Sequence, residues 1–175
     1  ATDGEMFVRI TAKAATAEEA ARLVAPVRDA VCRRLGEHVY GVDVENLESV
    51  VVPLLLQRGE TLTTAESCTG GLLAKRITDV AGASSVFHQG VVTYANEAKT
   101  RLLGVPEELL ASVGAVSPEV ARCMAEQACT RYGSTWGVGI SGIAGPGGAT
   151  ATKPVGLVYI ALSNGRQTWL RVMRH

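Results

Sequence analysis

The stretch "TLTTAESCTGGLLAKRIT" at residues 61–78 decides the fold, because it joins a strand pattern to a helix pattern through a short polar turn. "TLTTA" is typical of a β-strand, and "GGLLAKRITDV" has the apolar spacing of an amphipathic helix. The turn contains two side chains that can act as nucleophiles, Ser67 and Cys68, followed by two glycines. Ligands of open α/β sheets bind where strands end and helices begin. The turn is therefore a candidate site, with a plain helix cap at Ser67 or Thr69 as the equal alternative.

The same alternation of strand and helix patterns continues toward the carboxyl terminus. "GVVTYA" leads into the helical pattern "NEAKTRLL", and "WGVGIS" follows a helix predicted from Pro118 to about Arg131 with Ser117 as its cap. The last two apolar segments, "VGLVYIAL" and "QTWLRVM", flank the turn "SNGR" and predict an antiparallel hairpin. The fold class predicted from these elements is α/β, a mixed sheet flanked by helices.

The organisation before residue 60 is different and predicts a small separate segment. "MFVRITA" alternates like a half-buried strand, and Thr16 with Glu19 forms a capping box for a helix that ends near Gly36. Pro26 should kink this helix or shift its start. "HVYGV" then predicts a second short strand. We expect a partial β-α-β segment at residues 1–43 and a main domain at 44–175, which begins with a helix over 44–58.

Composition and charge exclude several classes of protein. With 47% hydrophobic and 19% charged residues the chain is typical of a globular protein, and the 17 basic residues balance 17 acidic ones. Net charge therefore gives no attraction to nucleic acid or to an anionic membrane. No apolar run approaches the roughly 20 residues of a membrane span, and no signal peptide pattern is present, so we expect a cytoplasmic protein. Four scattered cysteines predict neither a zinc site nor a disulfide framework.

Two further loops carry residues that suit a binding site. "TYANEAK" runs from a strand into a helix and carries Tyr94, Asn96 and Lys99. Asn96 is the expected cap, and Lys99 lies about one turn into the helix. Lys99 either contributes to a site or is an ordinary surface lysine. "SGIAGPGGATATKPVG" places five glycines and two prolines between strands, which exceeds the needs of a simple connection. Three such loops at one edge of a sheet would form a pocket.

The motifs together resemble a known family. "TAESCTGG", "GVVTYANEAK", "GAVSPEVA", "GISGIAGPGG" and "KPVG" occur in the order found in the carboxy-terminal domain of the CinA family, the nicotinamide mononucleotide deamidases. The resemblance covers about residues 48–175, and residues 5–43 are similar to the trailing part of the KH-type domain that precedes it. It implies hydrolysis of the nicotinamide carboxamide to nicotinate mononucleotide and ammonia in pyridine nucleotide salvage, with no metal or other cofactor. It also implies a homodimer or a higher homo-oligomer.

The resemblance also implies roles for individual residues. Ser67 would be the nucleophile and Lys99 its base, with Tyr94 in the catalytic cluster. The residues that would contact the substrate or line the oxyanion hole are Thr69, Gly70, Gly71, Asn96, Ser141 and Gly142.

The chemistry of an amide constrains the lysine. A lysine acts as a base only when it is neutral, so the pKa of Lys99 must fall from about 10.4 toward about 7 to 8. Burial and the positive end of a helix both lower the pKa of an amine. We therefore expect Lys99 to be mostly buried and within hydrogen-bond reach of Ser67, directly or through Tyr94.

Two other catalytic arrangements compete with this interpretation. A triad of serine, histidine and carboxylate would need one of the three histidines, His38, His88 or His175. Alternatively Cys68 could be the nucleophile with Glu66 and Lys99 as partners, since a helix amino terminus lowers the pKa of a thiol; otherwise Cys68 is a small packing residue.

Other candidate binding residues have simpler interpretations. The glycine-rich loop lacks the phosphate-loop spacing, which leaves Lys153 as a partner of the substrate phosphate or as a surface lysine. Glu66 orders the nucleophile turn or is solvated.

The carboxyl terminus departs from the family pattern. Family members continue after the last strand with a Gly-Asp-Arg type segment and a closing helix, whereas this sequence ends at "LRVMRH". The expected domain is therefore truncated, and Arg171 and Arg174 lie in the predicted strand and do not replace the family arginine. This leaves a non-enzymatic alternative, an inactive binding or assembly module of a competence- or damage-associated protein. Direct binding of nucleic acid is disfavoured, because residues 1–43 lack the G-x-x-G loop of KH domains.

Overall fold

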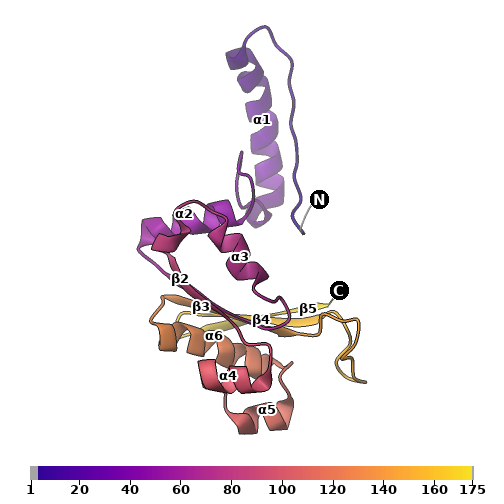
Figure 1. The fold of residues 1–175 in the computed structure, drawn as a ribbon. Coiled ribbons are helices and arrows are strands. Elements are labelled where there is room, and N and C mark those ends of the chain that lie inside the picture. The colour runs from indigo at the N-terminus through magenta and orange to yellow at the C-terminus, as the bar shows by residue number, and fades with distance from the viewer. Residues whose placement is uncertain (1–3, 175) are drawn as a thin grey trace. The chain divides into compact units, whose positions relative to one another are not determined.

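The computed structural model describes residues 4–174. The chain divides into two compact units, residues 1–50 and residues 51–175 (Figure 1). The helices of the described part include none that is both long and apolar enough to span a bilayer.

The carboxy-terminal unit is built on a five-stranded mixed sheet in the order β2-β1-β3-β4-β5. β1 pairs in parallel with both β2 and β3, whereas β3 with β4 and β4 with β5 are antiparallel. The predicted mixed sheet and its final hairpin are confirmed, and the carboxyl ends of three strands meet at one edge. The strands are β1 Leu62–Glu66, β2 Phe87–Val92, β3 Trp136–Gly142, β4 Leu157–Ser163 and β5 Thr168–Arg174.

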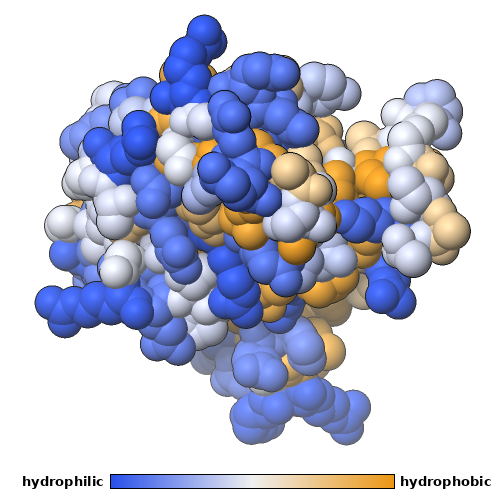
Figure 2. All heavy atoms as spheres, turned by 90° about the horizontal axis from the view of Figure 1, so that it is seen from below, coloured by the Kyte–Doolittle hydropathy of each residue, from blue (hydrophilic) through white to orange (hydrophobic). Residues whose placement is uncertain are grey.

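Helices cover both faces of this sheet (Figure 1). α2 and α3 lie on one face, where Val52 of α2 shares a core with Leu62 of β1. α4, α5 and α6 lie on the other, where Leu103 of α4 and Met124 of α6 pack around Ala65 of β1. Seen from the side of α4, α5 and α6, the surface is mostly hydrophilic, as expected for amphipathic helices (Figure 2). The helices are α2 Glu48–Arg58, α3 Leu72–Thr78, α4 Asn96–Leu103, α5 Glu107–Val113 and α6 Pro118–Tyr132, with a short 3-10 turn, η2, at Ala83–Ser85.

The close contact between α6 and β3 depends on two glycines. A Cβ atom on Gly137 would collide with the carbonyl oxygen of Ala125 in α6. One on Gly139 would collide with the carbonyl oxygen of Ala121 and lie 2.6 Å from the backbone nitrogen of Ala125. The backbone of α6 therefore packs directly against β3. This contact sets the distance between the sheet and the layer formed by α4, α5 and α6.

The amino-terminal unit is organised around α1, Ala17–Leu35, followed by the 3-10 turn η1, Gly36–His38. The predicted cap is confirmed, because the Thr16 hydroxyl accepts from Glu19 N at 3.2 Å. The reciprocal bond of a capping box is shifted by one residue, since the Glu19 carboxylate accepts from Ala15 N at 3.2 Å and not from Thr16 N. The helix runs through Pro26 without ending there.

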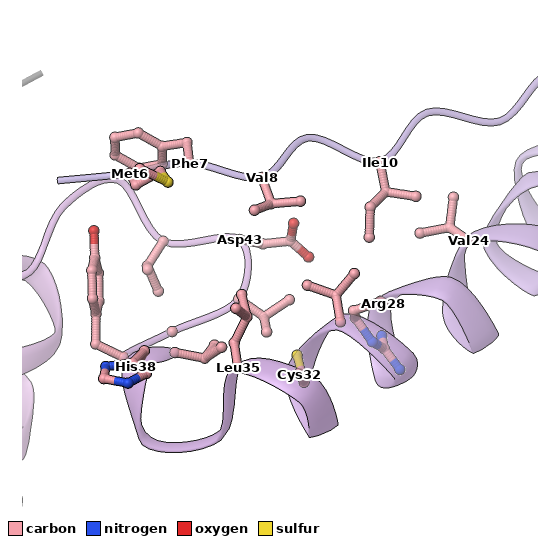
Figure 3. Close-up of a pocket in the computed structure, with 16 residues that line it drawn as sticks. Met6, Phe7, Val8, Ile10, Val24, Arg28, Cys32, Leu35, His38 and Asp43 are labelled. Carbon is pink, nitrogen blue, oxygen red and sulfur yellow. The ribbon is translucent and has the colours of Figure 1, made fainter. Parts of the chain in front are cut away.

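The structure differs from the sequence prediction in the two short strands beside α1. Residues 6–10 form no strand, and residues 39–44 bend at Val42 and Asp43, where Asp43 has a φ of 54°. No strand ladder joins the two segments within the described residues. A strand persists only where a neighbouring backbone pairs with it. Instead, side chains such as Val8 and Ile10 point toward α1 and line an apolar cleft of about 250 Å³ (Figure 3). None of residues 4–50 is fully buried.

Smaller differences concern where elements begin. α2 begins at Glu48 rather than at residue 44, because the Asn46 side chain accepts from Ser49 N at 2.9 Å and caps the chain there. β2 begins at Phe87, earlier than the predicted strand, and α5 was not predicted at all.

Substituting Gly139 by alanine tests the contact between β3 and α6. The added methyl group meets backbone atoms that no rotamer change can move, so we expect the free energy of unfolding to fall by about 1–3 kcal/mol or more. Gly147→Ala is the matched control, because nothing lies within 4 Å of the position of its Cβ. The measurement is the urea midpoint of each protein. Equal midpoints for the two variants would contradict this account of the packing.

Candidate active site

Two residues singled out in the sequence, Ser67 and Ser141, lie with Thr93 where the three parallel strands end. Ser67 follows β1, Thr93 follows β2, and Ser141 lies near the end of β3. Thr93 N donates to Glu66 O at 2.7 Å, and Ser67 N donates to Ile140 O at 3.0 Å. The backbone of Ser67 is thus held by β3, and that of the preceding residue, Glu66, is held by the residue that follows β2.

Lys99 reaches Ser67 from α4. Its side chain is 1% exposed, and its Nζ lies 3.1 Å from Ser67 Oγ. The same Nζ donates to the backbone carbonyls of Thr93 at 2.7 Å and of Tyr94 at 3.3 Å. The expected burial and contact are confirmed, and the contact is direct rather than through the Tyr94 phenol.

The surroundings of Lys99 favour its neutral form. In residues 4–174 no carboxylate forms an ion pair with this amine, and burial lowers the pKa of Lys99. A neutral amine has two N–H donors and one lone pair. The carbonyls of Thr93 and Tyr94 can take the two donors, which leaves the lone pair for the hydroxyl proton of Ser67. The pair is arranged for proton transfer from serine to lysine.

The turn after Ser67 explains the two glycines in the sequence motif. Gly70 N donates to Ser67 O at 3.1 Å, and this bond closes the turn. Gly70 and Gly71 have φ angles of 62° and 98°, a region that residues with a Cβ rarely adopt. Gly71 immediately precedes α3, so the glycines bend the chain sharply from β1 into the helix.

Glu66 is the residue of this site whose function the sequence left open. It is 0% exposed and accepts three hydrogen bonds. The donors are the Thr69 hydroxyl at 2.6 Å, Leu73 N at 3.0 Å and Ala74 N at 2.8 Å. Its position just before a helix was the available signal, since carboxylates often accept from free N–H groups in the first helical turn. Glu66 orders the turn and is not solvated.

Two predicted substrate contacts have hydroxyl groups that are already engaged. The Thr69 hydroxyl donates to Glu66, and the Ser141 hydroxyl donates to Ala115 O at 2.6 Å. Gly142 ends β3 in a tight position, because a Cβ there would lie 2.7 Å from Leu157 O. These residues shape the edge of the site through their backbone.

Tyr94 and Asn96 are placed differently from the expectation. The Tyr94 side chain is 75% exposed, and only its backbone carbonyl contacts Lys99. Asn96 is exposed and is the first residue of α4, whose cap position is occupied by Ala95. The prediction that Asn96 caps the helix is therefore wrong, and both side chains are exposed.

The cysteine alternative loses its physical basis in the structure. The Cys68 side chain is half-buried, and this burial raises the pKa of the thiol, although hydrogen bonds from backbone N–H groups act in the opposite direction. An expectation that the helix end would lower this pKa is not met, because desolvation is the larger effect. The raised pKa disfavours the thiolate that a cysteine nucleophile requires.

The histidine triad has no suitable histidine in the described residues. His88 lies at the start of β2, beside the Leu62 end of β1, and is therefore roughly 13 Å from the Ser67 end by the rise of four residues in a strand. His38 belongs to the amino-terminal unit, and His175 lies outside the described residues.

Lys153 anchors the glycine-rich loop. Its Nζ donates to Val113 O at 2.7 Å, at the carboxyl end of α5, where a positive charge is favourable. Thr150 also supports it, because the Thr150 hydroxyl accepts from Lys153 N at 3.1 Å. Lys153 is half-buried, so the simple surface interpretation does not hold.

Comparison with known families identifies the chain. The family model of the CinA C-terminal domain matches residues 44–175, and that of the damage-inducible protein CinA KH domain matches residues 1–41. The chain belongs to the CinA family. A CinA-like protein of Desulfovibrio desulfuricans is 65% identical over 174 residues, which are 99% of this chain and 41% of that protein. A CinA-like protein of Kosmotoga olearia is 50% identical over 162 residues, 93% of this chain and 39% of that protein. The chain thus spans about two fifths of the length of these curated relatives.

Solved CinA structures share the fold. A competence/damage inducible protein from Agrobacterium tumefaciens is 42% identical with a TM-score of 0.72, covering 78% of this chain and 83% of that one. A competence-damaged protein (CinA) superfamily member from Escherichia coli is 32% identical with a TM-score of 0.72, covering 81% of this chain and 85% of that one.

The buried amine of Lys99 makes stability depend on pH. Burial lowers its pKa in the folded protein below the unfolded value of about 10.4. Between the two pKa values the unfolded chain binds more protons than the folded chain, so the free energy of unfolding rises with pH. We expect the free energy of unfolding of the wild type to rise with pH up to about pH 10.4. Lys99→Met should not show this rise, because it has no amine at this position. The check is the melting temperature of both proteins across this pH range, and parallel curves would contradict a neutral Lys99.

Proposed function

We propose that this CinA chain hydrolyses the carboxamide of nicotinamide mononucleotide to nicotinate mononucleotide and ammonia. The observation that carries the proposal is the buried contact of 3.1 Å between Lys99 Nζ and Ser67 Oγ. An amide resists hydrolysis unless a nucleophile is activated by a base, and this pair supplies both. The choice of nicotinamide mononucleotide among amides rests on the motifs shared with the family.

In the first half of the proposed reaction, Ser67 Oγ attacks the carboxamide carbon. The Oγ–C bond forms as the hydroxyl proton passes to the lone pair of Lys99 Nζ, and the electrons of the C=O double bond move to its oxygen. When this tetrahedral intermediate collapses, the C–N bond breaks. Lys99 returns the proton to the leaving nitrogen, and ammonia departs from a nicotinoyl ester of Ser67.

In the second half, water hydrolyses the ester. Lys99 takes a proton from the water as its oxygen attacks the ester carbon, and it then gives the proton to Ser67 Oγ as that atom leaves. The net reaction consumes one water and releases nicotinate mononucleotide and ammonia. In both halves Lys99 Nζ carries the proton, from Ser67 to the leaving nitrogen and then from water to Ser67.

The geometry also suggests where the negative charge of the intermediate is held. The backbone N–H groups of Cys68 and Thr69, the two residues after the nucleophile, contact only the Cys68 thiol in the bonds recorded for the described residues. In acyl transfer, N–H groups at this position turn to the developing oxyanion and stabilise it.

Substitution of the nucleophile tests the reaction. Ser67→Ala should lower kcat for ammonia release from nicotinamide mononucleotide by at least about 10³-fold, because within residues 4–174 the hydroxyl of Ser67 alone contacts Lys99 Nζ. Cys68→Ala is the matched control at the next position and should retain most of the activity. The measurement is coupled ammonia detection with the purified chain. Loss of activity in Cys68→Ala but not in Ser67→Ala would make the cysteine the nucleophile.

The binding-module alternative predicts a different result. A chain that only assembles with partners would release no ammonia with Ser67 or without it. The names of the solved relatives refer to competence and damage and not to a reaction, which favours keeping this second candidate. The ammonia assay tests it as well. Wild-type turnover that depends on Ser67 rejects it.

A further inference from the structure

A fully buried carboxylate lies immediately before the proposed nucleophile, yet it takes no part in the reaction described above. Glu66 directs both oxygens toward the turn and the first turn of α3. Oε2 accepts from the Thr69 hydroxyl and from Leu73 N, and Oε1 accepts from Ala74 N. Every neighbour is a donor, so the site is matched to a group that only accepts.

These hydrogen bonds fix the segment that carries the catalytic groups. Ser67 and Thr69 lie at the first and third positions of the turn that Gly70 N closes. Glu66 precedes the turn on β1, and its side chain reaches forward to Thr69 and to the helix beyond. The carboxylate therefore links the two ends of the turn. The N–H groups of Cys68 and Thr69 lie between those fixed ends.

We propose that Glu66 is a positioning residue, which holds the N–H groups of Cys68 and Thr69 in place to stabilise the oxyanion formed at Ser67. This inference rests on the proposed serine amidase function. Glu66 touches neither substrate nor Lys99, and it acts through the conformation of the turn. Binding of the substrate before attack does not require this stabilisation, so kcat falls without a matching rise in KM when Glu66 is changed.

The isosteric substitution Glu66→Gln separates shape from hydrogen bonding. Glutamine fills the same volume, but its amide nitrogen must face either Ala74 N or Leu73 N, and a backbone N–H can only donate. The turn then loses at least one anchor. Thr69→Val removes another anchor and leaves Glu66 in place, so it tests the same link if Glu66→Gln folds poorly.

The test uses p-nitrophenyl acetate, a simple ester that does not depend on recognition of a nucleotide. Ser67 Oγ forms a bond to the acetyl carbon, its proton passes to Lys99, and the bond to p-nitrophenolate breaks. Release of p-nitrophenolate gives the rate, and mass spectrometry locates the acetyl group on Ser67. We expect Glu66→Gln and Thr69→Val to slow this acylation at least about 10-fold, less than the roughly 10²- to 10³-fold cost of removing an oxyanion donor, because the N–H groups are displaced and not lost.

Matched variants distinguish positioning from loss of stability. Glu60→Gln makes the same chemical change beyond the other end of β1, where Glu60 accepts from Trp136 Nε1 at 2.8 Å, and should leave the acylation rate unchanged. Thr69→Ser keeps the hydroxyl and should restore the rate to within a few-fold of the wild type. All rates are measured well below the melting temperature of each variant, so a purely structural role for Glu66 would not change them.

The outcomes separate this inference from the proposed function. Wild-type acylation rates in both Glu66→Gln and Thr69→Val would overturn the positioning role, whether or not nicotinamide mononucleotide is hydrolysed. A wild-type chain that is not acylated at Ser67 would overturn the serine nucleophile, and the inference with it. Slow acylation in both variants together with no ammonia release by the wild type would support Glu66 and reject the nucleotide substrate.

Discussion

The parallel pairing of β1 with both of its neighbours is the constraint on which the site depends. Because β2, β1 and β3 run in the same direction, their carboxyl ends bring Thr93, Ser67 and Ser141 to one edge. Each strand end then continues into a different loop or helix. A serine from one connection can meet a lysine from another only because the sheet fixes both to the same edge, which is the general reason that α/β sheets bind ligands there.

The helical layer of α4, α5 and α6 supports the edge of the sheet where β1, β2 and β3 end. Gly137 and Gly139 allow α6 to lie directly on β3. Before α6 begins, two backbone carbonyls accept from side chains on the other side of the edge. Ala115 O accepts from Ser141 of β3, and Val113 O accepts from Lys153 of the glycine-rich loop. The glycine-rich loop is therefore tied to the helical layer by hydrogen bonds to backbone, although most of its residues are exposed.

Local patterns in the sequence predicted much of this architecture, and their limits are physical. The change of period from "TLTTA" to "GGLLAKRIT" located β1 and α3, and the family motifs led to the contact between Ser67 and Lys99. The partners of Glu66 were not predictable in this way, because two of them are backbone N–H groups that become available only where α3 begins. Likewise, the partner of Lys153 lies at the end of α5, a short helix without a clear sequence signal. The segments beside α1 have strand-like patterns, but a pattern cannot supply the neighbouring backbone that a strand requires.

Side chains alternate between the two faces of β1. This alternation explains why the buried carboxylate of Glu66 and the buried amine of Lys99 both lie near Ser67 without forming an ion pair. Thr64 and Glu66 point toward the α3 face, whereas Ala65 packs with Leu103 of α4 on the other. Ser67 continues the second series and meets Lys99 from α4. A carboxylate beside Lys99 would stabilise the ammonium form and raise the pKa of the amine. By holding Glu66 on the opposite face with three donors of its own, the strand keeps the carboxylate away from the base that must stay neutral.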